Sequence, residues 1–399
     1  MAAESSGGSR AASGVRVVVV AHGPPMRGGI ATVALDIVED PVLDQEFEVV
    51  FYNTSQNDDR RGEFGMQNVA RAFEHAWGTF RLARRGSVVH SHAVQHPVFV
   101  AWRQVAIALA ARARGARVLL HNHAQPPYME PPGEYRVSTP HRWAFRVLDR
   151  LVDANVLIAA AGEPNLRQYM PGTELPVIAN SIEVDEVEPT TADHDPPVVL
   201  FVGEMLERKG LVVLMDALDI LEQRGVTDFE LRIVGDNTPG LDPDKDAMSE
   251  LITARGRAGA MTGPLPRDEV YRHLSEADVY VFPTYTEGQP FTVIESLAAG
   301  VPIVASDIQA IHNMIVDGDH GALVEAGDAE GFANAIQELL EDPARRRKVS
   351  EANRAHAKRR FDRSVFRGRM AELYRLHGRP SRRVLRRQRR TRSTQADRG

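Results

Sequence analysis

The sequence predicts an α/β protein made of two Rossmann-like domains that face each other across a cleft. Short β-branched runs alternate with helical patterns along the chain, as in doubly wound parallel sheets. The alternation stops in an acidic stretch at 183–197 that contains proline and threonine, and it then starts again, so we expect this stretch to be the linker between the domains. The 399 residues, 43% of them apolar, are enough for two hydrophobic cores.

The first half contains the expected pattern of buried parallel strands, because its apolar runs are continuous rather than alternating. Residues 1–14 are small and polar, and we expect them to be disordered. We place the first domain at 15–185. Strands are expected at 15–21, 47–51, 88–90, 117–121, 152–158 and 177–178, and helices at 30–39 and 98–114.

The second half repeats the alternation, and we place the second domain at 198–360. A helix at 361–377 follows it. Strands are expected at 198–202, 230–234, 279–282 and 302–305, and helices at 211–224, 270–277, 290–299 and 332–340.

The composition excludes several kinds of site. The chain has no cysteine, which excludes disulfides, thiolate-bound metals and a thiol nucleophile. No apolar run reaches the ~18 residues of a membrane span, and the run at 17–21 is too short for a signal peptide. We therefore expect a cytoplasmic protein.

The charge is unevenly distributed along the chain. Residues 379–399 contain nine arginines and one aspartate, so this tail carries +8 within a net charge of −6. A basic tail on an acidic body predicts peripheral contact with an anionic membrane surface, and nucleic acid is the less favoured partner. A disordered, solvated tail is the alternative.

The most informative segment is 282–306, in which a strand, a loop with an acid and a glycine, and a helix follow one another. Pro290 suits the first helical position, where a missing N–H costs nothing. The free amides of that helix start can receive a diphosphate or polar sugar groups. Glu287 precedes the helix and Glu295 lies about two turns inside it, so both can face one ligand.

In this segment the chain resembles the retaining nucleotide-sugar glycosyltransferases of family 4, which have the GT-B architecture. Glu287 and Glu295 match the E-x7-E pair of that family. The resemblance spans nearly the whole chain and is densest at 198–306; it also includes the segments 178–181, 201–210, 263–266 and 277–279. It implies transfer of a sugar from a nucleotide diphosphosugar to a hydroxyl acceptor with retention of configuration, and a last helix that crosses back to the first domain.

The resemblance also implies roles for single residues. Glu287 lies against the donor sugar, Glu295 holds the ribose hydroxyls and Lys209 offsets the charge of the leaving diphosphate. Glu204 stands where the family often has arginine, so we expect Arg208 or backbone amides to replace that phosphate contact. The further donor-binding residues are Gly263, Gly288, Gln289, Pro290, Phe291 and Thr292.

In the first half, the Gly28-Gly29 pair follows the first strand and allows close approach of the backbone to the donor phosphate. Two histidine doublets end predicted strands: His90 with His92, and His121 with His123. The resemblance places His123 near the transferred sugar as a catalytic residue. Alternate histidines on a strand could also bind a metal, but we expect a structural or acceptor-side role for the other three.

No metal or other cofactor is expected to be required. Two D-x-D patterns, 242–244 and 317–319, lie in turns rich in glycine or proline and are interpreted as solvated. The proline-rich segment 126–140 is a candidate acceptor contact. The helix at 98–114 could lie on a membrane, although core packing is favoured.

Several alternatives remain open at this point. The acceptor can be a saccharide, a lipid-linked sugar or a small natural product. A sugar-nucleotide epimerase or hydrolase of the same fold is the second interpretation. An anionic-surface binding protein that uses the arginine tail is the third.

Overall fold

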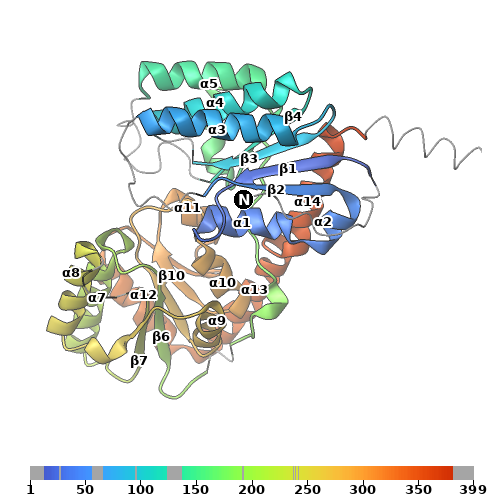
Figure 1. Cartoon of the computed structure of the whole chain (residues 1–399). Coiled ribbons are helices and arrows are strands. Elements are labelled where there is room, and N and C mark those ends of the chain that lie inside the picture. Colours follow the sequence, from blue (N-terminus) through green and yellow to red (C-terminus); the bar gives the residue numbers. More distant parts are fainter. Residues whose placement is uncertain are drawn as a thin grey trace, which may run out of the picture. The chain divides into compact units, whose positions relative to one another are not determined.

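The computed structural model describes residues 13–26, 28–55, 66–94, 97–123, 137–190, 193–236, 238, 240 and 242–380 (Figure 1). They form two compact units. The first unit contains the chain up to Ile178 and again from Arg367, and the second contains Ala179–Phe366. Of the segment 1–14, which was expected to be disordered, residues 1–12 lie outside the described residues, whereas Ser13 donates its N–H to the Glu46 carbonyl at 2.9 Å. Residues 126–136 of the proline-rich segment and nearly all of the basic tail also lie outside the described residues.

The first unit contains a parallel sheet in the order β2-β1-β3-β4-β5. Helices α3, α4 and α5 lie on one face of this sheet, and α1 and α14 lie on the other (Figure 1). The strands are β1 (Arg16–Ala21), β2 (Glu48–Asn53), β3 (Val88–Ala93), β4 (Arg117–Asn122) and β5 (Ala154–Leu157). The helices are α1 (Gly29–Val38), α2 (Pro41–Glu46), α3 (Met66–Leu82), α4 (Val98–Ala113), α5 (Thr139–Leu151), α6 (Glu163–Arg167) and α14 (Arg363–His377).

The second unit contains a parallel sheet in the order β11-β10-β9-β6-β7-β8. Its strands are β6 (Val198–Val202), β7 (Glu230–Val234), β8 (Met261–Gly263), β9 (Val279–Phe282), β10 (Ile303–Ser306) and β11 (Gly321–Val324). Its helices are α7 (Leu211–Gln223), α8 (Pro243–Ala254), α9 (Arg267–Ser275), α10 (Phe291–Ala299), α11 (Gln309–His312), α12 (Ala329–Glu341) and α13 (Pro343–Arg360).

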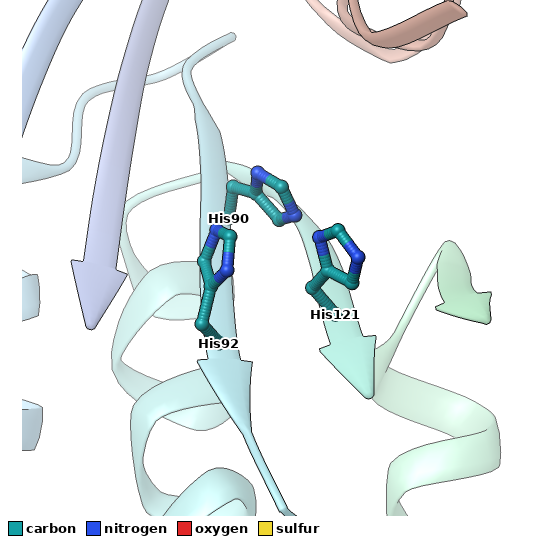
Figure 2. A group of neighbouring side chains, drawn as sticks. All are labelled: His90, His92 and His121. Atoms are coloured by element: carbon teal, nitrogen blue, oxygen red, sulfur yellow. The ribbon is translucent and has the colours of Figure 1, made fainter. Parts of the chain in front are cut away.

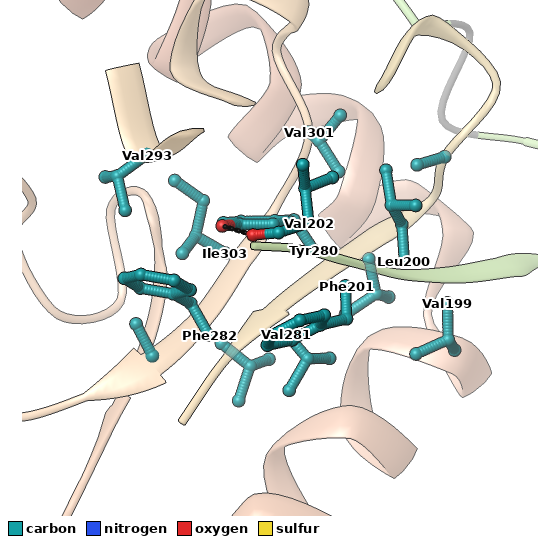
Figure 3. Packing of buried hydrophobic residues seen from close by; sticks show 14 of the residues in the cluster. Val199, Leu200, Phe201, Val202, Tyr280, Val281, Phe282, Val293, Val301 and Ile303 are labelled. Carbon is teal, nitrogen blue, oxygen red and sulfur yellow. Dashed lines mark hydrogen bonds between the residues drawn. The ribbon is translucent and has the colours of Figure 1, made fainter. Parts of the chain in front are cut away.

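The core of the second unit explains why its central strands read as continuous apolar runs. Both faces of β6 and β9 are covered, and every residue of these two strands is buried. Tyr280, Phe282 and Phe201 are the large side chains at the centre, with Val293 of α10 and Ile303 of β10 around them (Figure 3). Each unit is thus a Rossmann-like α/β layer structure, as the sequence predicts.

The predicted linker at 183–197 differs from what the structure shows. The boundary between the units comes earlier, at 178/179. Val184 and Val187 are fully buried in the second core, and the Thr190 N–H donates to the carbonyl of Ala299 at 2.8 Å. Few but well-placed apolar residues are therefore enough to fold this acidic stretch onto the second unit.

The last helix belongs to the first unit from Arg367 onward. Arg367 Nε donates to Asp40 Oδ2 at 2.5 Å, and Arg375 pairs with Glu46 at the end of α2. Tyr374 is fully buried and its ring meets Phe47 edge-on at 5.4 Å. The first unit is therefore built from two segments that are far apart in the sequence.

Candidate functional site

The site in the second unit lies where the strand order of the sheet reverses. When the strands of this unit are numbered from one, their order in the sheet is 3-2-1-4-5-6. The strands β7 and β8, which follow β6, are added on one side of it, and β9 and the strands that follow it are added on the other side. Ligands bind at such switch points, at the carboxyl ends of the two strands. The loop after β6 contains Lys209, and the loop after β9 contains Glu287.

Lys209 and Glu287 form an ion pair at this point. Lys209 Nζ donates to Glu287 Oε1, although the two residues are 78 positions apart. Their side chains are 11% and 12% exposed, so the pair is largely shielded from water but still accessible. Thr284 Oγ1 lies 3.5 Å from the same carboxylate oxygen, and Lys209 Nζ lies 5.5 Å from the ring centroid of Phe282.

The two loops can approach this closely because residue 210 is glycine. Gly210 has φ 76°, and a Cβ there would lie 1.9 Å from the carbonyl oxygen of Pro283. Next to it, the carbonyl of Arg208 accepts from Tyr285 N at 2.9 Å and from Thr284 Oγ1 at 3.2 Å. The loops are thus joined through main-chain atoms beside the ion pair.

The start of α10 differs in detail from the prediction. Pro290 is the N-cap, with φ −69° and ψ 129°, and the helix begins at Phe291. Glu295 is therefore the fifth helical residue, just over one turn inside and not two. No side chain caps the helix, so the amides of its first turn, including those of Phe291 and Thr292, are available to an anion.

Glu295 is almost completely buried. Burial raises the pKa of its carboxyl group, and Arg267 Nη2, 3.7 Å from Oε1, opposes that rise only in part. The buried phenol of Tyr280 also has a pKa well above its usual value, because of burial and of the nearby carboxylates Glu287 and Glu295. Both glutamates therefore lie close enough to Tyr280 to act on it electrostatically.

Gln289 and Arg208 make contacts within the protein that the sequence did not predict. The Gln289 side-chain oxygen accepts from Asn180 N at 2.6 Å, and its carbonyl accepts from Asn180 Nδ2 at 3.1 Å. Arg208 donates to Glu204 at 2.8 Å on an exposed face. Glu204 thus neutralises Arg208, which leaves Lys209 as the cation beside Glu287.

Three side chains of this site were not identified from the sequence. Thr284 and Asn180 act through hydrogen bonds between distant segments, which no local pattern shows. Arg267 directly follows the segment 263–266, whose Gly263 ends β8 with φ 80°. The position of Arg267 after that segment is the signal that could have identified it.

Gly28 and Gly29 lie in the first unit, at the start of α1. Gly28 is the N-cap with φ 134°, a conformation that favours glycine, and no side chain caps the helix. The preceding loop is fixed by Ser55 Oγ, which accepts from Gly23 N at 2.8 Å, and by Asn53 Nδ2, which donates to the Pro24 carbonyl at 2.8 Å. The sequence did not identify these two polar residues, Asn53 at the end of β2 and Ser55 just after it.

The histidine doublets meet on one face of the first sheet. His92 and His121 are direct partners in the register of β3 and β4. His92 Nδ1 lies 2.9 Å from Nε2 of the half-buried His123. Burial lowers the pKa of His90 and of His123 to about 3, and lowers the pKa of His92 and His121 well below the usual value. All four imidazoles are therefore neutral at pH 7.

The D-x-D patterns have local structural roles. Asp242 caps α8 by accepting from Asp244 N at 3.0 Å, and Asp317 accepts from Leu323 N at 2.9 Å. The expectation that no metal is required for the reaction remains a prediction. Within the described residues, no helix combines the length and the apolar character needed to cross a bilayer.

The second unit matches a known protein family. Residues 185–356 match the family model described as Glycosyl transferases group 1. This segment is a glycosyltransferase group 1 domain. It contains Lys209, Glu287 and Glu295, and the fold of the chain is that of GT-B glycosyltransferases.

The chain is similar to known glycosyltransferases in sequence and in structure, as three examples show. The amylovoran biosynthesis glycosyltransferase AmsK of Erwinia amylovora is 31% identical over 45% of this chain and 45% of its own length. The phosphatidyl-myo-inositol mannosyltransferase of Mycobacterium leprae is 32% identical over 51% and 54%. The chain thus matches about half the length of these curated relatives. The structure of Anabaena HepE with UDP and glucose superposes with a TM-score of 0.68 at 16% identity, over 90% of this chain and 99% of that chain.

Proposed function

We propose that the protein transfers a glycosyl group from a nucleotide diphosphosugar to a hydroxyl acceptor, with retention of the anomeric configuration. The observation that supports this most directly is the Lys209–Glu287 ion pair at the switch point, beside the uncapped start of α10. A cation and free helix amides suit a diphosphate, and a carboxylate beside them suits sugar hydroxyls.

In this proposal each group of the site has one task. Lys209 Nζ and the first-turn amides of α10 stabilise the negative charge that develops on the leaving diphosphate. Glu287 accepts hydrogen bonds from the donor sugar and holds Lys209 in position. Glu295 accepts from the ribose hydroxyls, and Arg267 orients its carboxylate. Gly28, Gly29 and His123 are proposed to contact the donor from the first unit.

Retention is proposed to proceed on one face of the sugar. A double displacement needs a carboxylate nucleophile together with a second, acidic carboxyl group, and the carboxylate of Glu287 is already paired with Lys209. Instead, the bond between the anomeric carbon and the diphosphate oxygen breaks while the acceptor oxygen bonds to that carbon. The acceptor proton passes to the leaving diphosphate, and a nucleoside diphosphate is released.

The proposed acceptor is a saccharide or a lipid-linked sugar, at the inner face of a membrane. The names of AmsK and of the mycobacterial mannosyltransferase refer to amylovoran biosynthesis and to phosphatidyl-myo-inositol. In the first unit, the adjacent helices α3, α4 and α5 expose aromatic side chains, which are typical of membrane interfaces. They are Phe73, Trp77, Trp102 and Trp143. Although α4 is mainly a core helix, as expected, Trp102 and Leu109 remain exposed.

Donor turnover tests the proposal. A thermal-shift screen of UDP, GDP, ADP and TDP sugars identifies the donor, because a ligand that binds only the folded state raises the melting temperature. With that donor, Lys209→Met and Glu287→Gln should each lower kcat about 10²–10³-fold, as removal of one stabilising group does elsewhere. NMR of the product reports the anomeric configuration.

Matched controls separate the loss of charge from general damage. Lys358→Met removes a lysine on α13 that pairs with Asp185. Glu276→Gln removes a carboxylate that pairs with Arg232. Both controls should turn over donor normally. Near-normal turnover in Lys209→Met and Glu287→Gln would contradict the assignment, and an inverted product would contradict retention.

The membrane contact has its own test. Removal of residues 379–399 should weaken binding to vesicles that contain anionic phospholipid while turnover in detergent persists. Equal binding by the shortened and the full chain would show that the tail is not the attachment. Strong, salt-dependent binding to RNA or DNA would favour nucleic acid instead.

A further inference from the structure

Three buried histidines of the first unit form a compact group, which we call the imidazole cluster: His90, His92 and His121. His90 and His92 are alternate residues of β3 and lie on one face of the sheet, and His121 lies opposite His92 on β4. The three rings converge in the same space (Figure 2). One ring nitrogen from each residue lies within 4.8 Å of the others, and ring centroids are 4.3–5.3 Å apart.

The cluster contains buried nitrogens that have no partner among the described residues. They are Nε2 of His90, Nε2 of His92 and both ring nitrogens of His121. Buried polar atoms are nearly always hydrogen-bonded, because their desolvation is otherwise uncompensated. Three convergent rings with free nitrogens therefore need an explanation that packing alone does not give.

The other ring nitrogen of two of these residues is already engaged. His90 Nδ1 lies 2.8 Å from the Tyr374 hydroxyl, and His92 Nδ1 lies 2.9 Å from His123 Nε2. Metal-binding histidines usually have such a partner on the nitrogen opposite to the metal, because it fixes the tautomer and the ring orientation. With the proton on Nδ1, the Nε2 lone pairs of His90 and His92, which have no partner among the described residues, can bind a metal.

We propose that His90, His92 and His121 bind one divalent transition-metal ion of the zinc class. Three neutral imidazoles suit Zn²⁺ and, among probes, Co²⁺, whereas Mg²⁺ and Ca²⁺ prefer oxygen ligands. A tetrahedral ion with metal–nitrogen bonds of about 2.0–2.1 Å needs nitrogens roughly 3.3 Å apart. Closing the distance from within 4.8 Å to this value requires the rings to turn about their side-chain bonds.

The ion would join segments that are distant in the sequence. It would cross-link β3 to β4 directly and connect them to α14 through His90 and Tyr374, which are separated by 284 positions. The half-buried His123 borders the cluster, with its ring centroid 4.4 Å from that of His121. This role is structural, and the metal titration that tests it does not depend on glycosyl transfer.

Metal titration of the full chain, prepared without a histidine tag and freed of metal with EDTA, tests the inference. Calorimetry with Zn²⁺ should give one ion per chain, and Co²⁺ should give the visible absorption bands of a tetrahedral site. His92→Gln and His121→Gln should each weaken Zn²⁺ binding at least about 100-fold. Tyr374→Phe removes only a hydroxyl beside a ligand and should weaken binding about 10–100-fold.

The control is His75→Gln, which replaces another buried histidine, on α3, outside the cluster. It should leave Zn²⁺ affinity and stoichiometry unchanged. The inference is overturned if the wild-type chain binds no ion. It is also overturned if the cluster variants bind Zn²⁺ as tightly as wild type, because the ion then lies elsewhere. Should a glutamine variant fail to fold, unchanged affinity in Tyr374→Phe would contradict the arrangement of ligand and partner.

Discussion

At the scale of single residues, the proposed donor site depends on an ion pair, Lys209–Glu287, that is largely shielded from water. Lys209, Glu287 and Glu295 were predicted as site residues through the family resemblance. The sequence could not show that Lys209 pairs with Glu287, or that Arg267 approaches Glu295, because those contacts join segments 78 and 28 positions apart. The depth of Glu295 in its helix was also misjudged, since Pro290 proved to be the N-cap and not the first helical residue.

The first prediction concerns the Lys209–Glu287 pair. Lys209→Met or Glu287→Gln alone should lower the free energy of unfolding of the second unit by about 3–5 kcal/mol, because each leaves one buried charge uncompensated. The double variant should lose less than the sum of the two, because no lone charge remains. Urea unfolding of the four chains measures this coupling, and strictly additive losses would show that the pair is not coupled.

The second prediction concerns pH and Glu295. Its pKa in the folded chain is raised above 4.5, so its protonated form stabilises the fold at low pH, and that stabilisation is lost as the pH rises through the raised pKa. Glu295→Gln does not titrate. Its melting temperature should therefore exceed that of wild type by a margin that grows from acidic to neutral pH. Arg267, Tyr271 and Glu287 are the charged or titratable neighbours of Glu295 and of the adjacent Tyr280. Both chains contain all three, so the difference between the chains reports the titration of Glu295.

Differential scanning fluorimetry across that pH range measures the margin. A constant difference between the two chains at all pH values would contradict the assignment, because it would mean that Glu295 ionises as an exposed glutamate does. Arg267 is 46% exposed at its side chain, so the loss of its partner should cost little.

At the scale of elements, the strands were the most predictable part. Their β-branched runs are buried on both faces, and this requirement is visible in the residues themselves. The helices were predicted less completely, because α2, α3, α5, α6, α8, α11 and α13 have no counterpart in the prediction. In α5 the first turn contains Pro140, which a helix start tolerates, although the preceding prolines indicated a loop. In α3 the exposed Phe73 and Trp77 obscure the amphipathic pattern.

The third prediction concerns Gly210, which determines how closely two loops approach. Gly210→Ala should destabilise the second unit by more than the roughly 1–3 kcal/mol cost of the left-handed conformation. The added Cβ would also lie 1.9 Å from the Pro283 carbonyl oxygen and push the Lys209 loop away. Donor affinity should fall together with the melting temperature.

The matched control is Gly225→Ala. Gly225 has φ 78°, but a Cβ there meets no atom within 4 Å. The control should show the conformational cost alone and normal donor affinity. Equal effects of the two substitutions would mean that the contact with Pro283 is unimportant.

At the scale of the whole molecule, the alternation of strands and helices predicted two α/β units, but not the order of strands within each sheet. That order depends on long-range pairing, such as β6 with β9, and it is what places Lys209 and Glu287 at one edge. The boundary between the units was also misplaced, because burial of Val184 and Val187 is not apparent in an acidic segment.

The fourth prediction separates the two units by their ligands. Nucleotide should slow amide hydrogen exchange mainly within residues 179–366, and Zn²⁺ should slow it mainly in β3, β4 and α14. Mass spectrometry of peptides from the same chain, with either ligand or both, measures this. Protection by nucleotide confined to the first unit would contradict the location of the donor site, and protection by Zn²⁺ confined to the second unit would contradict the imidazole cluster.

The discontinuity of the first unit has a consequence for synthesis on the ribosome. All of residues 179–366 emerge after β5 and before the part of α14 that packs on Phe47 and His90. The second unit can therefore complete its core while the first still lacks its closing helix. A nascent chain that ends before residue 367 should therefore contain a folded second unit and an incomplete, chaperone-sensitive first unit.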